Sequence, residues 1–130
     1  MITPSTRYLE VTEAAPDAFV SACPSRGLVA RLGEKWALLL LVAIGAGVCR
    51  FGELRRRLEG VSGKMLTQTL RNLERDGLVD REVVSTRPFA VQYRLTPLGA
   101  DLLPLARSLK RWAETHLHAI EANNQRFDGA

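Results

Sequence analysis

A regular spacing of hydrophobic residues between positions 62 and 77 predicts an amphipathic helix. Its apolar face carries Leu66, Leu70 and Leu73, with Met65 beside them. Ser62 suits the N-cap position, because its hydroxyl can accept hydrogen bonds from the free amides of the first turn. Gly77 suits the residue that follows the helix, where a left-handed backbone favours glycine.

The opposite face of this helix is polar and carries Lys64, Thr67, Gln68, Arg71 and Arg75. Such side chains can read a DNA groove: arginine can grip guanine O6 and N7, glutamine can pair with adenine, and threonine can contact a thymine methyl group or a phosphate. Together with Ser62 they are the candidate DNA-binding residues of the helix. An ordinary solvated helix face has the same composition, so the neighbouring elements have to decide between the two interpretations.

A short helix is predicted just upstream. Its apolar stripe consists of Phe51, Leu54 and Leu58. Its other side carries a run of arginines, which fits either a solvated face or contact with phosphates, and Arg55 and Arg56 are the candidates for phosphate contact. A tight turn follows, in which Gly60 is free to take a positive φ. Two short helices joined by such a turn form a helix-turn-helix.

Two short valine-rich runs, residues 78–85 and 90–95, predict a β-hairpin with its tip at residues 86–89. An exposed Arg87 at this tip is a candidate for contact with a minor groove or a phosphate, although an arginine in solvent fits nearly as well. Thr96 then begins a last helix as its N-cap. The predicted fold is mainly α with a small β-hairpin wing (α+β), a winged helix-turn-helix.

The net charge of +4 is unevenly distributed. Residues 1–49 carry four basic and four acidic side chains, residues 95–130 carry four of each, and residues 50–94 carry ten basic and six acidic side chains. The whole excess therefore lies on the predicted helix-turn-helix and wing. A local basic surface of this kind fits a protein that binds double-stranded DNA.

The longest apolar run, residues 36–48, is too short to cross a bilayer and predicts a buried helix that ends near Gly45 and Gly47. The first residues contain neither the basic nor the apolar segment of a secretion signal. We therefore expect a cytoplasmic protein with no membrane partner.

Many residues of the chain match one family pattern. They are Cys23-Pro24, Gly33-Glu34-Lys35-Trp36, Phe51-Gly52-Glu53-Leu54-Arg55, Lys64-Met65-Leu66-Thr67-Gln68, Leu70-Arg71, Leu73-Glu74, Asp76-Gly77-Leu78-Val79, Arg81, Tyr93, Leu95-Thr96 and Leu98-Gly99. With these motifs the chain resembles the HxlR-type family of bacterial winged-helix transcriptional regulators, which are MarR-like, over about residues 23–118. The resemblance implies a homodimer that binds a short palindromic or repeat-like operator, as a repressor or an activator.

The chain departs from this pattern at the wing. Relatives often read Pro-Pro-Arg-Val-Glu-Tyr there, and this chain has Pro88-Phe89-Ala90-Val91-Gln92-Tyr93. The basic residue after the prolines is missing, and Arg87 lies on the other side of Pro88. With the resemblance, the chain divides into an N-terminal extension that contributes to the dimer interface, residues 1–22; a winged helix-turn-helix DNA-binding core, residues 23–96; and a C-terminal dimerisation helix with a short tail, residues 97–130.

The last predicted helix carries a broad apolar stripe. Its members are Leu102, Leu103, Leu105, Ala106, Leu109, Trp112, Ala113 and Ile120. This stripe is wider than packing against the chain's own wing requires, so we expect part of it to meet a second subunit. Residues 17–22 and the helix over residues 28–32 are expected to complete the interface. Such a dimer holds its recognition helices about 34 Å apart, one turn of duplex. A helix packed entirely on its own core is the alternative.

Cys23 lies directly before Pro24, at the predicted cap of a helix that continues through Arg26 and Arg31. A helix N-terminus with an arginine nearby stabilises the thiolate, which reacts with oxidants and electrophiles. Several members of the family that the chain resembles use the cysteine at this position as a redox or aldehyde sensor. We hypothesise that Cys23 senses thiol-reactive stress, and a small buried cysteine that only packs is the alternative. Cys49 either takes part in this thiol sensing as a second cysteine or has no role in it.

Other functions have less support. His116 and His118 point in different directions on a helix, and no His-Glu-x-x-His motif or phosphate-binding loop is present, so we expect neither an enzyme nor a metal or cofactor. A winged helix that binds a protein instead of DNA is one alternative, although polar residues such as Gln68 and Arg71 argue against it. A small-molecule effector at the dimer interface, as in MarR-type regulators, is the alternative to thiol sensing.

Overall fold

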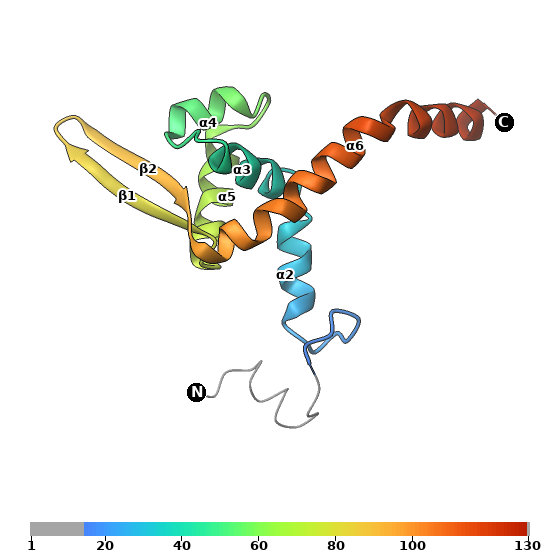
Figure 1. The fold of residues 1–130 in the computed structure, drawn as a ribbon, viewed down its shortest axis with the longest axis horizontal. Helices are drawn as coiled ribbons and strands as arrows, with labels where there is room; N and C mark the ends of the chain where they lie inside the picture. The colour runs from blue at the N-terminus through green and yellow to red at the C-terminus, as the bar shows by residue number, and fades with distance from the viewer. Residues whose placement is uncertain (1–14, 130) are drawn as a thin grey trace.

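The computed structural model describes residues 15–129, which form five helices and one β-hairpin (Figure 1). In chain order the elements are α2 (Ser25–Leu32), α3 (Ala37–Gly45), α4 (Phe51–Arg57), α5 (Gly63–Arg75), β1 (Val79–Thr86), β2 (Phe89–Leu95) and α6 (Pro97–Gly129). This is the predicted winged helix-turn-helix: α4 and α5 form the helix pair, and β1 and β2 form the wing. Residues 1–14 of the predicted N-terminal extension lie outside the described part.

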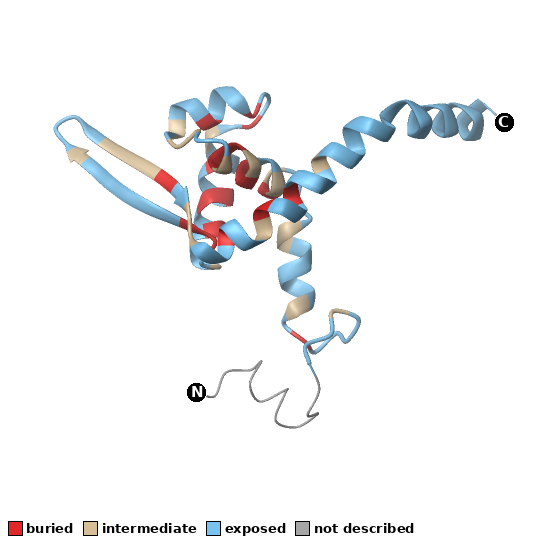
Figure 2. Cartoon of the chain, viewed as in Figure 1, coloured by how far each residue is buried: buried red, intermediate tan, exposed pale blue. Residues whose placement is uncertain are grey.

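Helix α3 lies at the centre of the core. It is apolar along its whole length, and Leu40 and Leu41 have no exposed surface. Leu54 of α4 and Leu66 of α5 are fully buried in the same cluster. Figure 2 shows the buried positions gathered where α3, α4 and α5 meet the base of the hairpin and the first turns of α6. Each such side chain contributes about 1.5–3 kcal/mol through burial, so this cluster fixes the helix pair.

The buried face of α5 differs from the prediction at one position. Met65 was predicted beside the apolar face, but its side chain is 41% exposed, and Thr69 is buried instead. Thr69 lies between Leu66 and Leu73 at helical spacing. Its buried hydroxyl has a hydrogen-bond partner, because it donates to the Met65 carbonyl over 2.8 Å. A threonine with this local hydrogen bond can therefore occupy a core position.

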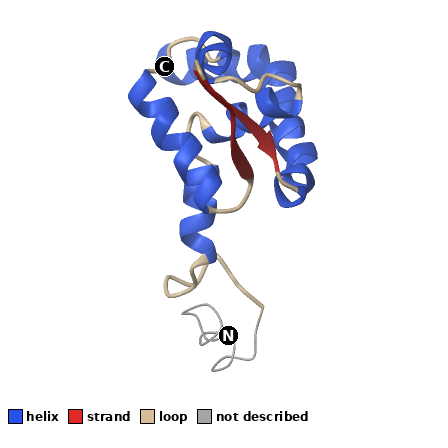
Figure 3. Cartoon of the chain, turned by 90° about the vertical axis from the view of Figure 1, so that its left-hand side faces the viewer, coloured by secondary structure: helices blue, strands red, loops and turns tan. Residues whose placement is uncertain are grey.

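The hairpin pairs β1 and β2 antiparallel from Val79 opposite Leu95 to Thr86 opposite Phe89, with an irregularity after Val83. Its strands run closer to the tip than predicted, because Thr86 and Phe89 still pair across it. Its base is buried and its tip is exposed, and the hairpin extends away from the helices on one side of the molecule (Figure 1); Figure 3 views it from that side. A single bridge between Arg50 and Gln92 ties the segment before α4 to β2.

Helix α6 begins as predicted and extends far beyond the core. Thr96 caps it: its hydroxyl oxygen accepts from the Gly99 amide (3.0 Å) and its hydroxyl donates to the Gly77 carbonyl (2.6 Å). The last buried residue of the helix is Ala106, and every residue from 111 to 129 is exposed. The second half of α6 therefore projects from the core (Figures 1 and 2). No helix in the described part of the chain is long and apolar enough to span a membrane.

Candidate nucleic-acid interface

The turn between α4 and α5 places the start of α5 beside α4. Gly60 takes the predicted positive φ of 92°, and the next residue, Val61, is buried. Ser62 then caps α5, and its side-chain oxygen accepts from the Met65 amide over 3.0 Å. Both conformations are local properties of a glycine and a serine, which is why the sequence predicts them.

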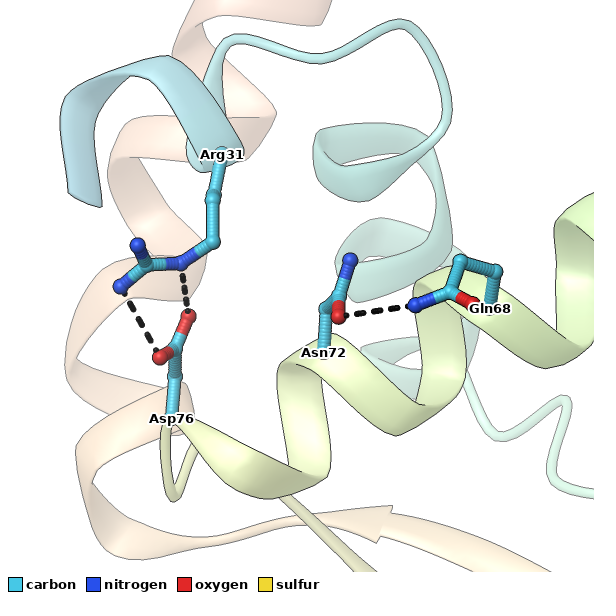
Figure 4. A network of polar contacts seen from close by, with 4 residues as sticks. All are labelled: Arg31, Gln68, Asn72 and Asp76. Carbon is cyan, nitrogen blue, oxygen red and sulfur yellow. Dashed lines mark hydrogen bonds and ion pairs between the residues drawn. The ribbon is translucent and has the colours of Figure 1, made fainter. Parts of the chain in front are cut away.

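The polar face of α5 is exposed along its length. Its exposed polar residues are Ser62, Lys64, Thr67, Gln68, Arg71, Glu74 and Arg75. Gln68 donates to the side-chain oxygen of Asn72 over 3.2 Å (Figure 4), so the amide of Asn72 belongs to the same surface. Asn72 was not among the predicted residues, although its place four residues after Gln68 on one helix is a signal that points to it.

A groove of about 600 Å³ lies between α5 and the wing. Thr67 and Arg71 line it from α5, while Arg81 and Phe89 line it from the hairpin. Arg81 was not predicted as a site residue, because a strand residue is assigned to a face only when the register of the hairpin is known. The groove brings two arginines together from elements that are separate in sequence.

The three other predicted arginines lie at different places. Arg55 lies over the start of α5, since a Cβ built on Gly63 would stand 3.2 Å from its guanidinium. Arg56 lies beside the loop between α3 and α4, where it lines a shallow hollow with Val48. Arg87 is exposed at the tip of the wing. The structure thus joins Arg55 to the polar face of α5 and holds Arg56 and Arg87 apart from it.

Cys23 is buried, with 3% of its surface exposed. Its Sγ and the hydroxyl of Ser25 share a hydrogen bond of 3.1 Å. This hydrogen bond lowers the pKa of the Cys23 thiol below its ordinary value, and burial opposes the shift in part. A hydroxyl that donates to sulfur favours the thiolate, whereas burial is typical of a cysteine that only packs.

Two expectations about Cys23 are wrong. The cap residue of α2 is Pro24, so Cys23 lies one position before the cap. Neither of the two expected arginines bonds to the thiol. Arg26 donates to the carbonyls of Ala18 and Phe19, and Arg31 donates to Asp76. A long side chain has several partners within reach, and two backbone carbonyls and one carboxylate attract these guanidinium groups more strongly than a neutral thiol does.

Cys49 has a backbone role. Its carbonyl accepts from the Tyr93 amide over 2.8 Å, next to the bridge that joins Arg50 to the wing. Both cysteines are free thiols.

Within residues 15–129, no three His, Cys, Asp or Glu side chains gather as a metal site. His116 stacks on Trp112 at 4.6 Å between ring centroids.

Residues 31–121 match the family described as HxlR-like helix-turn-helix. The chain belongs to this HxlR-like family. It is 40% identical over 104 residues to the HTH-type transcriptional regulator YtfH of Escherichia coli (strain K12), covering 80% of this chain and 82% of that protein. The chain is accordingly a transcriptional regulator with a helix-turn-helix, and its relatives are regulators rather than enzymes.

Solved structures of HxlR-like relatives show the same fold. The transcriptional regulator ytfH from Salmonella typhimurium superposes with a TM-score of 0.80 at 38% identity, covering 85% of this chain and 99% of that chain. The redox regulator HypR in its reduced form superposes with a TM-score of 0.69 at 36% identity, covering 76% of this chain and 98% of that chain. The winged helix-turn-helix of this HxlR-like chain is thus a fold shared with known regulators.

Proposed function

We propose that this protein binds a short palindromic operator in double-stranded DNA as a homodimer and thereby regulates transcription. The observation that carries the proposal is the exposed polar face of α5, beside a groove that Arg71 and Arg81 line together. A helix of 13 residues with an exposed polar face suits insertion into a major groove. In a regulator of this kind the protein acts where the chromosome is, in the cytoplasm.

The residues of the interface have two roles in this proposal. Thr67, Gln68 and Arg71 read base edges, because they lie in the middle of the exposed face of α5. The remaining candidates contact phosphates and sugars, and these are Arg55, Arg56, Ser62, Lys64, Arg75 and Arg87. Contacts of the second kind fix the position of the protein on the duplex without reading its sequence.

The projecting part of α6 supports the homodimer. Its exposed large apolar residues are Leu105, Leu109, Trp112, Leu117, Ile120 and Phe127. Helix α2 also exposes apolar side chains, with Val29 at 59%. Soluble chains rarely leave so many large apolar side chains in water, so a second copy covers them. In this proposal α2 and α6, together with the segment before α2, form the interface.

Control by thiol chemistry is the second part of the proposal. The lowered pKa of the Cys23 thiol supports it, and so does the relationship to HypR, which is a redox regulator. Oxidation or electrophilic modification of Cys23 replaces a buried thiol that is bonded to Ser25, so the turn before α2 has to rearrange. If α2 lies in the dimer interface, this rearrangement alters the spacing of the two recognition helices.

Fluorescence anisotropy tests both parts. The purified protein is titrated with a duplex from the region upstream of its own gene and with a random duplex of the same length, under reducing conditions and after diamide. We expect tighter binding to the upstream duplex, lost after diamide and restored by a thiol reductant. Cys23→Ser is expected to keep DNA binding and to lose the diamide response, whereas Cys49→Ser, the matched control, is expected to keep both.

The outcomes separate the alternatives. Failure to bind either duplex at low salt rejects the DNA-binding proposal and favours a protein-interaction module, whose apolar contacts depend little on ionic strength. A preference for the upstream duplex that ignores diamide rejects thiol control. In that case a cavity of about 370 Å³ between α2, α3 and α5 becomes the candidate effector site, because its walls combine Ala30, Leu32 and Leu73 with polar groups.

A further inference from the structure

A paired ion contact joins α2 to the end of α5. Arg31, in the last turn of α2, donates from Nε and Nη2 to the two carboxylate oxygens of Asp76, each over 3.0 Å (Figure 4). Asp76 is the C-cap residue of α5. The contact with this carboxylate raises the pKa of the Arg31 guanidinium, and the fork of two parallel hydrogen bonds fixes the relative orientation of both groups.

The packing beside this contact is loose. The cavity of about 370 Å³ separates Ala30 and Leu32 from Met65 and Leu73 of α5. Helix α2 has no buried residue of its own. This space is partly open to solvent, and the side chains of α2 and α5 do not fill it. Among residues 15–129, the two bonds from Arg31 are the hydrogen bonds that join α2 to α5.

Asp76 belongs to a row of side chains that reaches the centre of the recognition surface. Gln68, Asn72 and Asp76 follow one another at intervals of four residues on α5, and Gln68 donates to Asn72. All three line the same cavity (Figure 4). A shift of α2 that pulls on Asp76 therefore acts on the same side of α5 as Gln68.

We infer that Arg31 is a positioning residue for DNA binding. It holds the C-terminal end of α5 at a fixed angle to α2, and through Asp76 it sets the direction in which the polar face of α5 meets the duplex. This inference rests on the proposed DNA-binding function. It assigns to α2 an effect on sequence recognition that is separate from any role of that helix in a dimer interface.

The test compares Arg31→Ala with the charge swap Arg31→Asp/Asp76→Arg in the full-length protein. The measured quantity is the ratio of affinities for the upstream duplex and for a random duplex of equal length. Arg31→Ala is expected to lower this ratio on the order of tenfold, a size typical of mutations that change coupling. The charge swap is expected to recover most of it, because the pair re-forms with reversed polarity. The matched control is Arg26→Ala, which removes the same side chain from α2 but breaks bonds to Ala18 and Phe19 instead.

A residue that only stabilises the fold would lower the unfolding temperature and leave the ratio unchanged. An unchanged ratio in Arg31→Ala, an equal loss in Arg26→Ala, or no recovery in the charge swap therefore overturns the inference. If the wild-type protein binds no duplex at all, the proposed function fails first. Amide hydrogen exchange then tests only the structural part of the inference: faster exchange in Arg31→Ala confined to the last turn of α5 shows that Arg31 holds this end of the helix, and unchanged exchange rejects that as well.

Discussion

Gly99, in the first turn of α6, lies directly against the backbone carbonyl of Leu78. A Cβ built on Gly99 would stand 2.0 Å from the Leu78 oxygen, far inside any real contact. The same oxygen accepts a hydrogen bond from the Thr96 amide over 3.1 Å. Recognition helix, wing and C-terminal helix therefore meet at one point, where the end of α5 passes into β1 and β2 passes into α6.

Gly99→Ala is expected to destabilise the protein by about 1–3 kcal/mol or more, because the methyl group collides with backbone that cannot move without breaking the bond to Thr96. Urea denaturation measures the free energy of unfolding. Gly52→Ala is the control, since a Cβ on Gly52 meets only the end of the Arg56 side chain at 3.5 Å. Equal stability of the Gly99→Ala and wild-type proteins would show that Gly99 does not lie this close to the Leu78 carbonyl.

The elements of the fold were predictable because their signals are local. The cap at Ser62, the positive φ at Gly77 and the start of α6 at Thr96 each depend on a few neighbouring residues, and the structure confirms all three. The exposed polar face of α5 follows from helical periodicity alone. For these features no tertiary contact had to be known.

Contacts across the fold were not predictable in this way. Arg31 and Asp76 are 45 residues apart, and nothing in their neighbourhoods indicates that they meet. A similar limit explains the wrong expectation about Cys23: Arg26 lies three positions from the thiol in sequence, but the conformation of the turns before α2 brings the Ala18 carbonyl to its guanidinium. A side chain of this length can reach several hydrogen-bond partners, and the conformation of the folded backbone determines which partner it binds.

Ser62→Ala is expected to cost about 1 kcal/mol of stability, because the Met65 amide loses the side-chain acceptor that lies 3.0 Å away. Ser62→Gly is expected to cost only a few tenths of a kcal/mol, since glycine is tolerated at an N-cap. Thermal unfolding followed by circular dichroism distinguishes the two variants. Identical transition temperatures for both variants and the wild type would contradict the capping role.

Arg71→Ala and Arg55→Ala are expected to weaken DNA binding in different ways. Loss of Arg71 removes a base contact, so it should cost about 1–3 kcal/mol on the specific duplex and reduce discrimination at one base position. Loss of Arg55 removes a phosphate contact, so it should weaken all duplexes alike and flatten the dependence of affinity on salt. Titrations of both duplexes at several salt concentrations measure this. Parallel behaviour of the two variants would reject the assigned roles.

Ser25→Ala is expected to make Cys23 less reactive near neutral pH. The Ser25 hydroxyl is the largest cause of the lowered pKa of the thiol, so its removal raises that pKa and moves thiolate formation to higher pH. The rate of alkylation by iodoacetamide is measured against pH in a Cys49→Ser background, which leaves Cys23 as the reacting thiol. The midpoint of the profile should shift upward in Ser25→Ala and stay in place in the control Ser21→Ala. A midpoint that does not move contradicts the assignment.

Leu109→Glu and Trp112→Glu are expected to convert a dimer into monomers. Both side chains are about half exposed on α6, beyond the last buried residue, Ala106, so a charge there disrupts contact between subunits and spares the core of one chain. Sedimentation velocity should show half the wild-type mass, with a far-UV circular dichroism spectrum that remains helical. Affinity for the upstream duplex should fall as well, because a monomer contacts one half-site. Thr115→Glu places the same charge at an exposed polar position of this helix and should leave the mass unchanged. If the glutamate variants keep the wild-type mass, α6 does not form the dimer interface.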